Sequence, residues 1–110
     1  MKSFFGFAGL ATIVVMLSAG ASTASAAADA AKGKENFEQC AVCHNADSTE
    51  KKMGPGLKGL YQKAKLNNGK AVNDANVKAL INAGGNGMPP YADVLSDAER
   101  ADLIAYLKTL

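Results

Sequence analysis

The sequence has little of what many binding sites are built from. Its 110 residues contain no tryptophan, one histidine, two cysteines and three prolines. One histidine excludes any site that needs two imidazoles from this chain, and the cysteines and histidine together are too few for a structural zinc site of those types alone. Two cysteines also exclude a disulfide-rich scaffold. A net charge of +2 is too small to indicate nucleic acid as the main partner.

Charged residues are missing between Lys2 and Asp29. A basic start, an apolar stretch and small residues ending in an A-x-A site at Ala26 are typical of a secretory signal peptide. The alternative is an uncleaved anchor, because an uncharged stretch of this length could span a bilayer. We expect cleavage of residues 1–26, which leaves a periplasmic domain over residues 27–110 with no stable membrane insertion.

Bulky apolar residues are scarce in that domain. Residues 27–110 hold 20 of them beside 15 alanines, and only four are aromatic. A core of this kind is marginal for the chain length, and small domains usually gain stability from a metal, a disulfide or a cofactor. We therefore expect a further group to complete the core.

Capping residues indicate three helices. Asp29 precedes one helical stretch, and Asn73 or Asp74 can cap a second. Ser96 and Glu99 have the spacing of a capping box, which predicts a third helix. The expected spans are residues 30–39, residue 73 or 74 to about 82, and the segment after residue 96 to the C-terminus.

Gly33 is unusual inside the first of these helices, where it costs about 1 kcal/mol relative to alanine. Phe37 lies one turn later on the same face. A glycine beside a single large aromatic residue predicts that another backbone crosses the helix closely at this point.

Glycine and proline separate the helical stretches and predict loops between them. Residues 45–73 form the longest loop, with a single helical turn expected around residues 60–65. No strand pattern, repeat or low-complexity tract is visible after the signal peptide. The expected class is therefore all-α, with short helices and loops so long that they need an object to wrap around.

The motif Cys40-Ala41-Val42-Cys43-His44 indicates what that object is. C-x-x-C-H is the attachment motif for c-type haem. The two thiols add to the vinyl groups on one edge of the porphyrin, and the adjacent histidine reaches the iron as an axial ligand. We expect one covalently attached haem c, with Cys40 and Cys43 as attachment sites and His44 as a metal ligand.

Other interpretations of the motif are weaker. A thioredoxin-like redox pair also uses C-x-x-C, but at a strand-to-helix junction, and here a helix precedes the motif. A zinc site would need a carboxylate from elsewhere as its fourth ligand. A disulfide between Cys40 and Cys43 suits an oxidising compartment, but it explains neither His44 nor the small core.

The second axial ligand must come from another residue type, because the motif uses the single histidine. Lysine would have to lose a proton against an ordinary pKa of about 10, whereas a thioether has none to lose. Met53 follows His44 closely and would have to round the porphyrin edge within a few residues. Met88 lies on a glycine-rich loop, and Pro89 biases it to an extended conformation. We therefore expect Met88 as the second metal ligand.

These features resemble the class I c-type cytochromes, and the small bacterial monohaem members in particular. The resemblance covers nearly all of residues 29–110 and implies the cytochrome c fold, with short helices and loops wrapped around one covalently bound haem. It also implies a carrier of single electrons that works with redox partner proteins and is not an enzyme. The matching segments are Gly33 with Phe37, Cys40–His44, Gly54–Leu57, Gly87–Pro89 and Leu103–Leu107.

Individual roles follow from the resemblance. Gly33 and Phe37 match the family's contact between the first and last helices, with Tyr106 as the aromatic partner. Pro55 matches the proline whose carbonyl accepts a hydrogen bond from the axial histidine, as such ligands usually require. Met88 matches the family's methionine ligand.

The sequence departs from the mitochondrial pattern because it has no tryptophan to reach a haem propionate. Tyr61, Tyr91 and the Asn67-Asn68 pair are the remaining candidate donors. Which of them serves a propionate stays open at the level of sequence.

Lysine is concentrated in residues 51–78, which hold seven lysines and a single acid, Asp74. A lysine-rich face near a haem edge can steer the chain to an acidic redox partner, and the alternative is a solvated surface that only aids solubility. The expected function is a soluble, monomeric electron carrier in a periplasmic respiratory or dehydrogenase-linked chain. The alternatives are a haem subunit of a larger oxidoreductase, and a haem enzyme or gas sensor with a displaceable sixth ligand.

Overall fold

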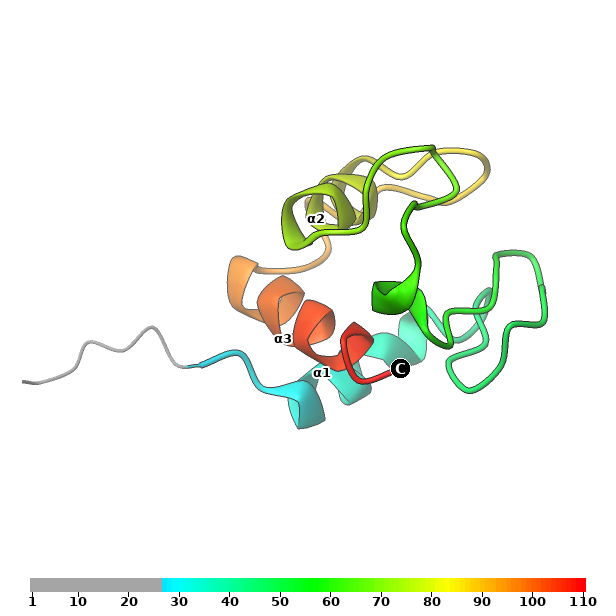
Figure 1. Cartoon of the computed structure of the whole chain (residues 1–110). Coiled ribbons are helices and arrows are strands. Elements are labelled where there is room, and N and C mark those ends of the chain that lie inside the picture. The colour runs from blue at the N-terminus through cyan, green and yellow to red at the C-terminus, as the bar shows by residue number, and fades with distance from the viewer. Residues whose placement is uncertain (1–26) are drawn as a thin grey trace, which may run out of the picture.

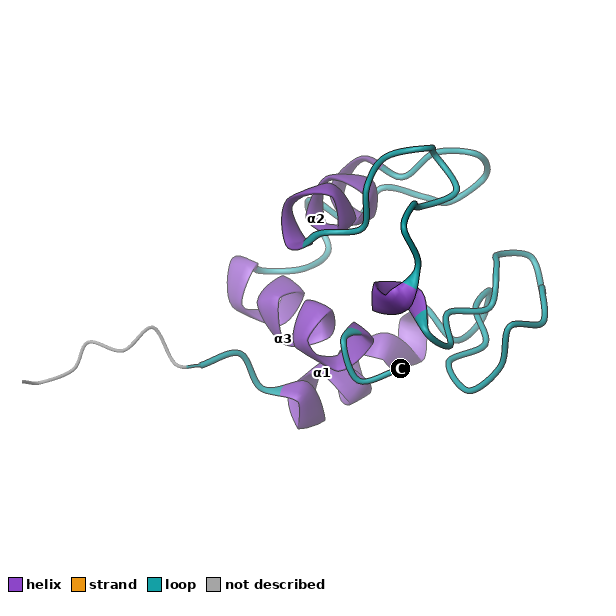
Figure 2. Ribbon diagram, in the orientation of Figure 1, coloured by secondary structure: helices purple, strands orange, loops and turns teal. Residues whose placement is uncertain are grey.

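The computed structural model describes residues 27–110, so the signal peptide expected over residues 1–26 lies outside the described part of the chain. From residue 27 onward no β-strand forms, only isolated bridges, and long loops join the helices (Figure 2). The expected all-α class is confirmed. The elements are α1 (Ala30–Asn36), the 3₁₀ turns η1 (Phe37–Gln39) and η2 (Leu60–Gln62), α2 (Asp74–Ala83) and α3 (Asp97–Leu107).

Side-chain caps determine where the helices begin. The Asp29 carboxylate accepts hydrogen bonds from two backbone N–H groups of the first turn of α1, at 2.9 and 3.3 Å. Asn73 caps α2 in the same way at 2.8 Å, and Ser96 and Glu99 form the expected capping box of α3. These caps satisfy N–H groups that have no partner inside the helix. The predicted helix starts are confirmed.

Three predicted boundaries differ from the structure. The helix expected over residues 30–39 is an α-helix only as far as Asn36 and continues as the 3₁₀ turn Phe37–Gln39. The helical turn expected over residues 60–65 stops at Gln62, because Lys63 takes an extended conformation with ψ of 149°. α3 ends at Leu107 rather than at the C-terminus, and the residues that follow form a hydrogen-bonded turn. None of the helices between residues 27 and 110 is long and apolar enough to cross a membrane.

α1 and α3 cross at Gly33 (Figure 1). A Cβ atom at this position would overlap the backbone oxygen of Asp102, so only glycine allows the two helices to approach so closely. The rings of Phe37 and Tyr106 pack beside the crossing, with centroids 5.4 Å apart and a tilt of 55°, an arrangement that aromatic pairs favour. The close crossing and its aromatic pair are both confirmed.

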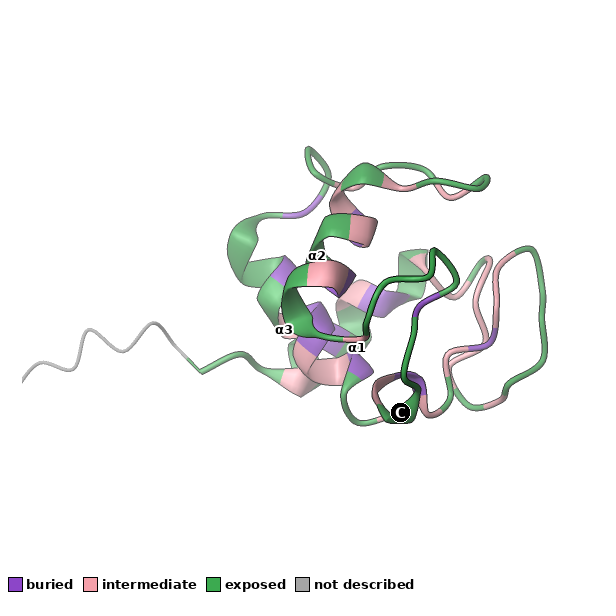
Figure 3. Ribbon diagram, turned by 45° about the horizontal axis from the view of Figure 1, so that its top comes forward, coloured by how far each residue is buried: buried purple, intermediate pink, exposed green. Residues whose placement is uncertain are grey.

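The hydrophobic core occupies the space between this crossing and α2. Its most buried side chain is Leu103 of α3, and the buried positions lie mainly on the helices, whereas most loop residues are exposed (Figure 3). Cys40, Met88 and Tyr91 are partly buried and pack against the same cluster. The core is therefore bordered by the residues to which the sequence assigns chemistry. Its buried members are Phe37, Leu60, Leu66, Val77, Ile81, Leu95, Leu103, Ile104 and Leu107.

The chain turns sharply after α2, and Met88 lies in this turn. Gly84 and Gly85 take φ of 65° and 138°, conformations that end a helix and favour glycine. Gly85 and Met88 then exchange two backbone hydrogen bonds of 2.9 and 3.0 Å, and the N–H of Tyr91 returns to α2 by donating to Ile81 at 3.0 Å. The glycine-rich loop is thus a closed, hydrogen-bonded turn.

Candidate metal centre

The motif residues Cys40 to His44 follow directly on η1 and continue its turn. The backbone N–H groups of Cys43 and His44 donate to the Cys40 oxygen at 3.1 and 2.9 Å. Of these three residues Cys40 is the one that packs against the core. Both cysteines are free thiols and neither is fully exposed. Burial, and secondarily the charge of Cys43, raise the pKa of Cys40 to about 11, so the thiol is held neutral.

The His44 ring is oriented by Pro55. Its Nδ1 atom lies 2.7 Å from the Pro55 carbonyl oxygen. A carbonyl can only accept a hydrogen bond, so Nδ1 carries the proton and donates it. The other ring nitrogen, Nε2, then keeps its lone pair, which is the form that ligates a metal. The hydrogen bond implied by the family resemblance is confirmed.

Gly54 allows the backbone to pass directly against this ring. A Cβ atom at residue 54 would lie 2.5 Å from Cε1 and 2.8 Å from Nδ1 of His44. The Gly54 N–H also donates to the Cys43 oxygen at 2.8 Å, which ties the segment to the motif. The sequence indicates this stretch as the support of His44, but it does not show that the ring itself excludes every larger residue at position 54.

The two methionines of the described chain lie in different surroundings. Met53 is 81% exposed, and its sulfur faces the Cys43 sulfur at 4.0 Å. Met88 is half-buried and packs against the core cluster together with Cys40. Met88 is therefore placed where an apolar group bordering the core could be enclosed, whereas Met53 faces solvent.

Tyr61 and Tyr91, the two tyrosines that are candidate donors to a haem propionate, have different surroundings. The Tyr61 hydroxyl donates to Asp74 at 3.0 Å, and Lys108 pairs with the other Asp74 oxygen at 2.7 Å. Burial, and then this hydrogen bond, raise the pKa of Tyr61 above its ordinary value. Tyr91 is half-buried and packs against the same cluster as Cys40 and Met88, and burial is the main cause that raises its pKa. Tyr61 is thus engaged in joining helices, and Tyr91 is the tyrosine that adjoins the candidate centre.

Two contacts near the candidate site could not be predicted from the sequence. The Lys52 ammonium group donates to the Ala41 oxygen at 3.1 Å and so bridges the following loop to the motif. Arg100 of α3 is buried and binds the segment that follows Met88. Lysine and arginine are mostly surface residues, so neither position stands out before the fold is known.

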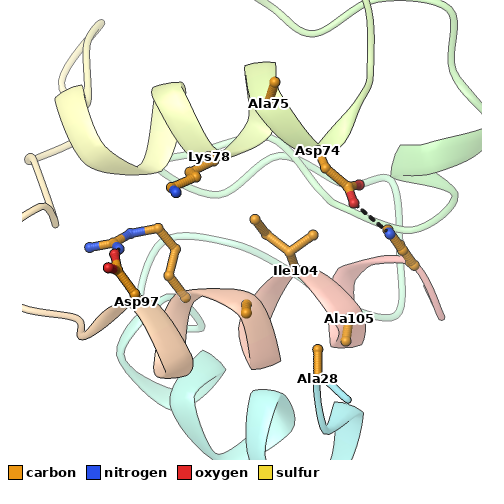
Figure 4. Close-up of a pocket in the computed structure, with 10 residues that line it drawn as sticks. Ala28, Asp74, Ala75, Lys78, Asp97, Ile104 and Ala105 are labelled. Carbon is orange, nitrogen blue, oxygen red and sulfur yellow. Dashed lines mark hydrogen bonds and ion pairs between the residues drawn. The ribbon is translucent and has the colours of Figure 1, made fainter. Parts of the chain in front are cut away.

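A separate hollow of about 410 Å³ lies between α2 and α3 (Figure 4). Asp74 and Lys78 border it from α2, and Asp97 and Ile104 border it from α3. No residue of the motif lines it, and charges of both signs surround it. It is therefore distinct from the part of the core against which Cys40 and Met88 pack.

Comparison with known proteins identifies the family. Residues 30–110 match the cytochrome c family. The chain belongs to that family. Cytochrome c2 of Blastochloris viridis is 34% identical over 106 residues, which cover 80% of this chain and 84% of the relative.

Solved structures agree with this membership. Cytochrome cH from Methylobacterium extorquens superposes with a TM-score of 0.58 at 28% identity and covers 74% of this chain and 99% of its own. Cytochrome c6 from the diatom Phaeodactylum tricornutum gives a TM-score of 0.55 at 27% identity, covering 74% and 92%. The fold is the cytochrome c fold.

The chain is a monohaem class I c-type cytochrome, an electron carrier and not an enzyme, which acts with redox partner proteins. Its cofactor is covalently attached haem c. The described residues fit this group: Cys40 and Cys43 are unpaired, His44 keeps Nε2 for a metal, and Met88 borders the same core. A flat apolar group at this edge would also enlarge a core that is small for its chain.

Proposed function

We propose that Cys40 and Cys43 carry the haem and that His44 and Met88 are the axial ligands of its iron. The observation that carries this proposal is the hydrogen bond from His44 Nδ1 to Pro55, because it leaves Nε2 as the metal-binding nitrogen. Met88 is favoured over Met53 because it is half-buried against the same cluster as Cys40, whereas Met53 is 81% exposed.

The protein's own residues set the conditions for electron transfer. The haem supplies a one-electron iron couple whose potential depends on ligand identity and burial. The Pro55 carbonyl oxygen accepts a hydrogen bond from His44 Nδ1–H, so the ring keeps one orientation and one tautomer. Cys40 and Met88 are partly buried against the hydrophobic cluster, so water is kept from the inner side of the site. A site held in this way changes little between oxidation states, which suits a carrier.

A pair of methionine variants tests the ligand. Met88→Ala should abolish the weak sulfur-to-iron charge-transfer band of the oxidised protein, lower the reduction potential and open the reduced iron to CO. Met53→Ala is the matched control and should leave all three nearly unchanged, because its side chain faces solvent. The opposite pattern would show that Met53 is the ligand. Ready CO binding by the unmutated protein would favour the gas sensor or haem enzyme.

We further propose that the mature domain, residues 27–110, works in the periplasm after removal of residues 1–26. The uncharged segment before Asp29 and the A-x-A site ending at Ala26 support this. Intact mass and N-terminal sequencing of the protein from a periplasmic extract should find Ala27 as the first residue. A chain that retains Met1 and sediments with membranes would instead be the anchored form.

The lysine-rich face, defined as the seven lysines of residues 51–78, is proposed to dock an acidic redox partner. Two of its members adjoin the motif: Lys51 forms a β-bridge with His44, and the Lys52 ammonium group contacts the Ala41 oxygen. Positive charge near the site where electrons leave would attract anionic partners. All of its members are exposed, namely Lys51, Lys52, Lys58, Lys63, Lys65, Lys70 and Lys78.

Small redox probes of opposite charge test this proposal. Oxidation by anionic hexacyanoferrate(III) should slow as ionic strength rises, and oxidation by cationic tris(phenanthroline)cobalt(III) should accelerate. Lys52→Gln should reduce the rate with the anion at low salt more than the control Lys32→Gln, an exposed lysine on α1. Flat salt profiles with both probes would assign these lysines to a solvated surface.

A further inference from the structure

Arg100 is a charged side chain inside the folded domain. The residue is only 3% exposed, and a buried guanidinium is costly unless acceptors surround it. Its Nη1 pairs with Asp97 at 2.8 Å, and its Nη2 donates to the backbone oxygens of Ala92 and Leu95 at 3.1 and 2.8 Å. Arg100 therefore links α3 to the segment between Met88 and α3.

That segment begins with the returning limb of the Met88 loop, and this loop is defined as residues 84–92. The backbone N–H groups of Tyr91 and Ala92 donate to the last turns of α2 at 3.0 and 3.3 Å. The loop thus leaves α2 and comes back to the same place. Ala92 is held from both sides, since its N–H contacts α2 and its oxygen contacts Arg100 of α3.

The contacts with the loop matter more than the ion pair. The side chain of Asp97 is 94% exposed, whereas that of Arg100 is 4% exposed, and an ion pair with one partner in solvent contributes little. Hydrogen bonds from a buried cation to backbone oxygens are stronger, and their loss leaves those oxygens without a donor. The Nε atom of Arg100 is buried and has no partner in the described part of the chain.

We propose that Arg100 is a positioning residue that keeps the Met88 loop closed and so holds Met88 at the haem. This inference rests on the proposed ligation by Met88. An outside ligand can replace Met88 only when the loop is open, so its apparent affinity scales with the open fraction. Removing Nη2 leaves the oxygens of Ala92 and Leu95 without their donor and raises that fraction.

Imidazole binding to the oxidised protein measures the open fraction. Arg100→Met keeps a long apolar stem without any N–H group, and its apparent imidazole affinity should rise by about tenfold or more. Arg100→Lys can still donate to a single oxygen, so its apparent imidazole affinity should lie between those of the unmutated protein and Arg100→Met. Loss of the sulfur-to-iron band during the titration shows that imidazole replaces a sulfur ligand.

We call the closure of the Met88 loop by Arg100 the clamp. Two control variants separate loss of the clamp from a general loss of stability. Asp97→Asn keeps an acceptor oxygen and removes only the exposed charge, so its imidazole affinity should stay close to that of the unmutated protein. Leu103→Ala removes the most buried core side chain without touching the loop contacts. It should lower global stability while leaving imidazole affinity nearly unchanged.

Amide hydrogen exchange provides a readout that does not depend on iron ligation. The N–H groups of Tyr91 and Ala92 should exchange faster in Arg100→Met than in the unmutated protein, because the loop opens locally. In Leu103→Ala the exchange rates of these two amides should rise only together with the exchange rates of the amides of α3. Faster exchange confined to the loop supports the clamp.

The outcomes distinguish the two proposals. The clamp would be overturned if Arg100→Met bound imidazole with the same affinity as the unmutated protein. It would also be overturned if Leu103→Ala raised the imidazole affinity as much as Arg100→Met does. A sulfur-to-iron band that survives in Met88→Ala would overturn the ligation, and loop-confined exchange in Arg100→Met would then still support the clamp on the loop. If Arg100→Met does not fold, Arg100→Lys carries the same comparisons.

Discussion

Gly54 and Pro55 act on the same imidazole from one short stretch of backbone. Pro55 fixes the ring because its carbonyl oxygen accepts a hydrogen bond from Nδ1–H, and Gly54 leaves room for the ring because it has no side chain. The orientation of the nitrogen that we propose as an iron ligand is thus decided by two neighbouring residues whose side chains do not contact the iron. Their effect on function is exerted entirely through His44.

Gly54→Ala should disturb both stability and the iron site. Its Cβ would lie 2.5 Å from the His44 ring, and relief of such an overlap typically costs about 1–3 kcal/mol. Because His44 must shift, the reduction potential should change as well. Denaturant unfolding and an optical redox titration measure the two effects.

Gly69→Ala is the control for this variant. Gly69 has φ of +81° and open space around it, so alanine there adds only backbone strain of about 1 kcal/mol. Its potential should equal that of the unmutated protein. A Gly54→Ala protein with unchanged potential would show that the loop moves and the ring does not.

At the scale of elements, Asp74 connects three parts of the fold. Its oxygens contact Tyr61 of η2 and Lys108 after α3, and the residue itself begins α2. The hydrogen bond from Lys108, followed by that from Tyr61, holds the pKa of Asp74 below its ordinary value. The group is largely exposed, so its contribution to stability is less than about 1 kcal/mol.

The sign of its pH dependence follows from this shift. A carboxyl group whose folded pKa is depressed stabilises the fold above its unfolded pKa, and this contribution is lost as the pH falls through the folded pKa. Below about pH 4 the unmutated protein should therefore lose stability more steeply than Asp74→Asn. Urea unfolding at a series of pH values measures this.

Asp93→Asn alters an exposed carboxylate in a loop and serves as the comparison. Its stability should follow that of the unmutated protein across the same pH range. If Asp74→Asn also follows it, the contact among η2, α2 and α3 contributes nothing measurable.

The helix starts were predictable because caps act over a few residues. Asp29, Asn73 and Ser96 each bond to N–H groups within their own first turn, so the signal is local. The motif is equally local, and so is the glycine-rich turn before Met88. These features let the sequence predict the all-α class and the candidate ligands.

Contacts between distant segments were predictable only where the type of a single residue indicated a close approach. Gly33 inside a helix indicated a close crossing, although not which backbone crosses there without the family resemblance. Arg100 gave no such signal, because a buried arginine looks like a surface one until the oxygens of Ala92 and Leu95 are placed beside it. The helix end at Leu107 was also missed, since no glycine or proline follows it.

The molecule as a whole depends on its cofactor for a complete core. The double variant Cys40→Ser with Cys43→Ser should be unfolded, because the haem is lost and the apolar cluster is too small to hold the chain alone. Circular dichroism and the haem absorbance of the purified protein measure this. In the unmutated protein the haem should also survive a denaturing gel.

Val42→Ser is the matched control, because it places serine between the two cysteines at a side chain that is 73% exposed. It should fold and keep its haem. A double cysteine variant that is helical, soluble and free of haem would contradict both the attachment sites and the argument from the small core.

The crossing of α1 and α3 joins the two ends of the domain, so we expect it to hold them together even when the chain between them is cut. Asp29 donates its N–H to Asp102 at 2.7 Å, beside the contact at Gly33. A protease that cut the exposed turn of residues 67–70 would leave two fragments still joined by their helices. One fragment would carry both cysteines and the histidine and the other Met88, so under the proposed ligation the carrier consists of two half-sites assembled on one haem.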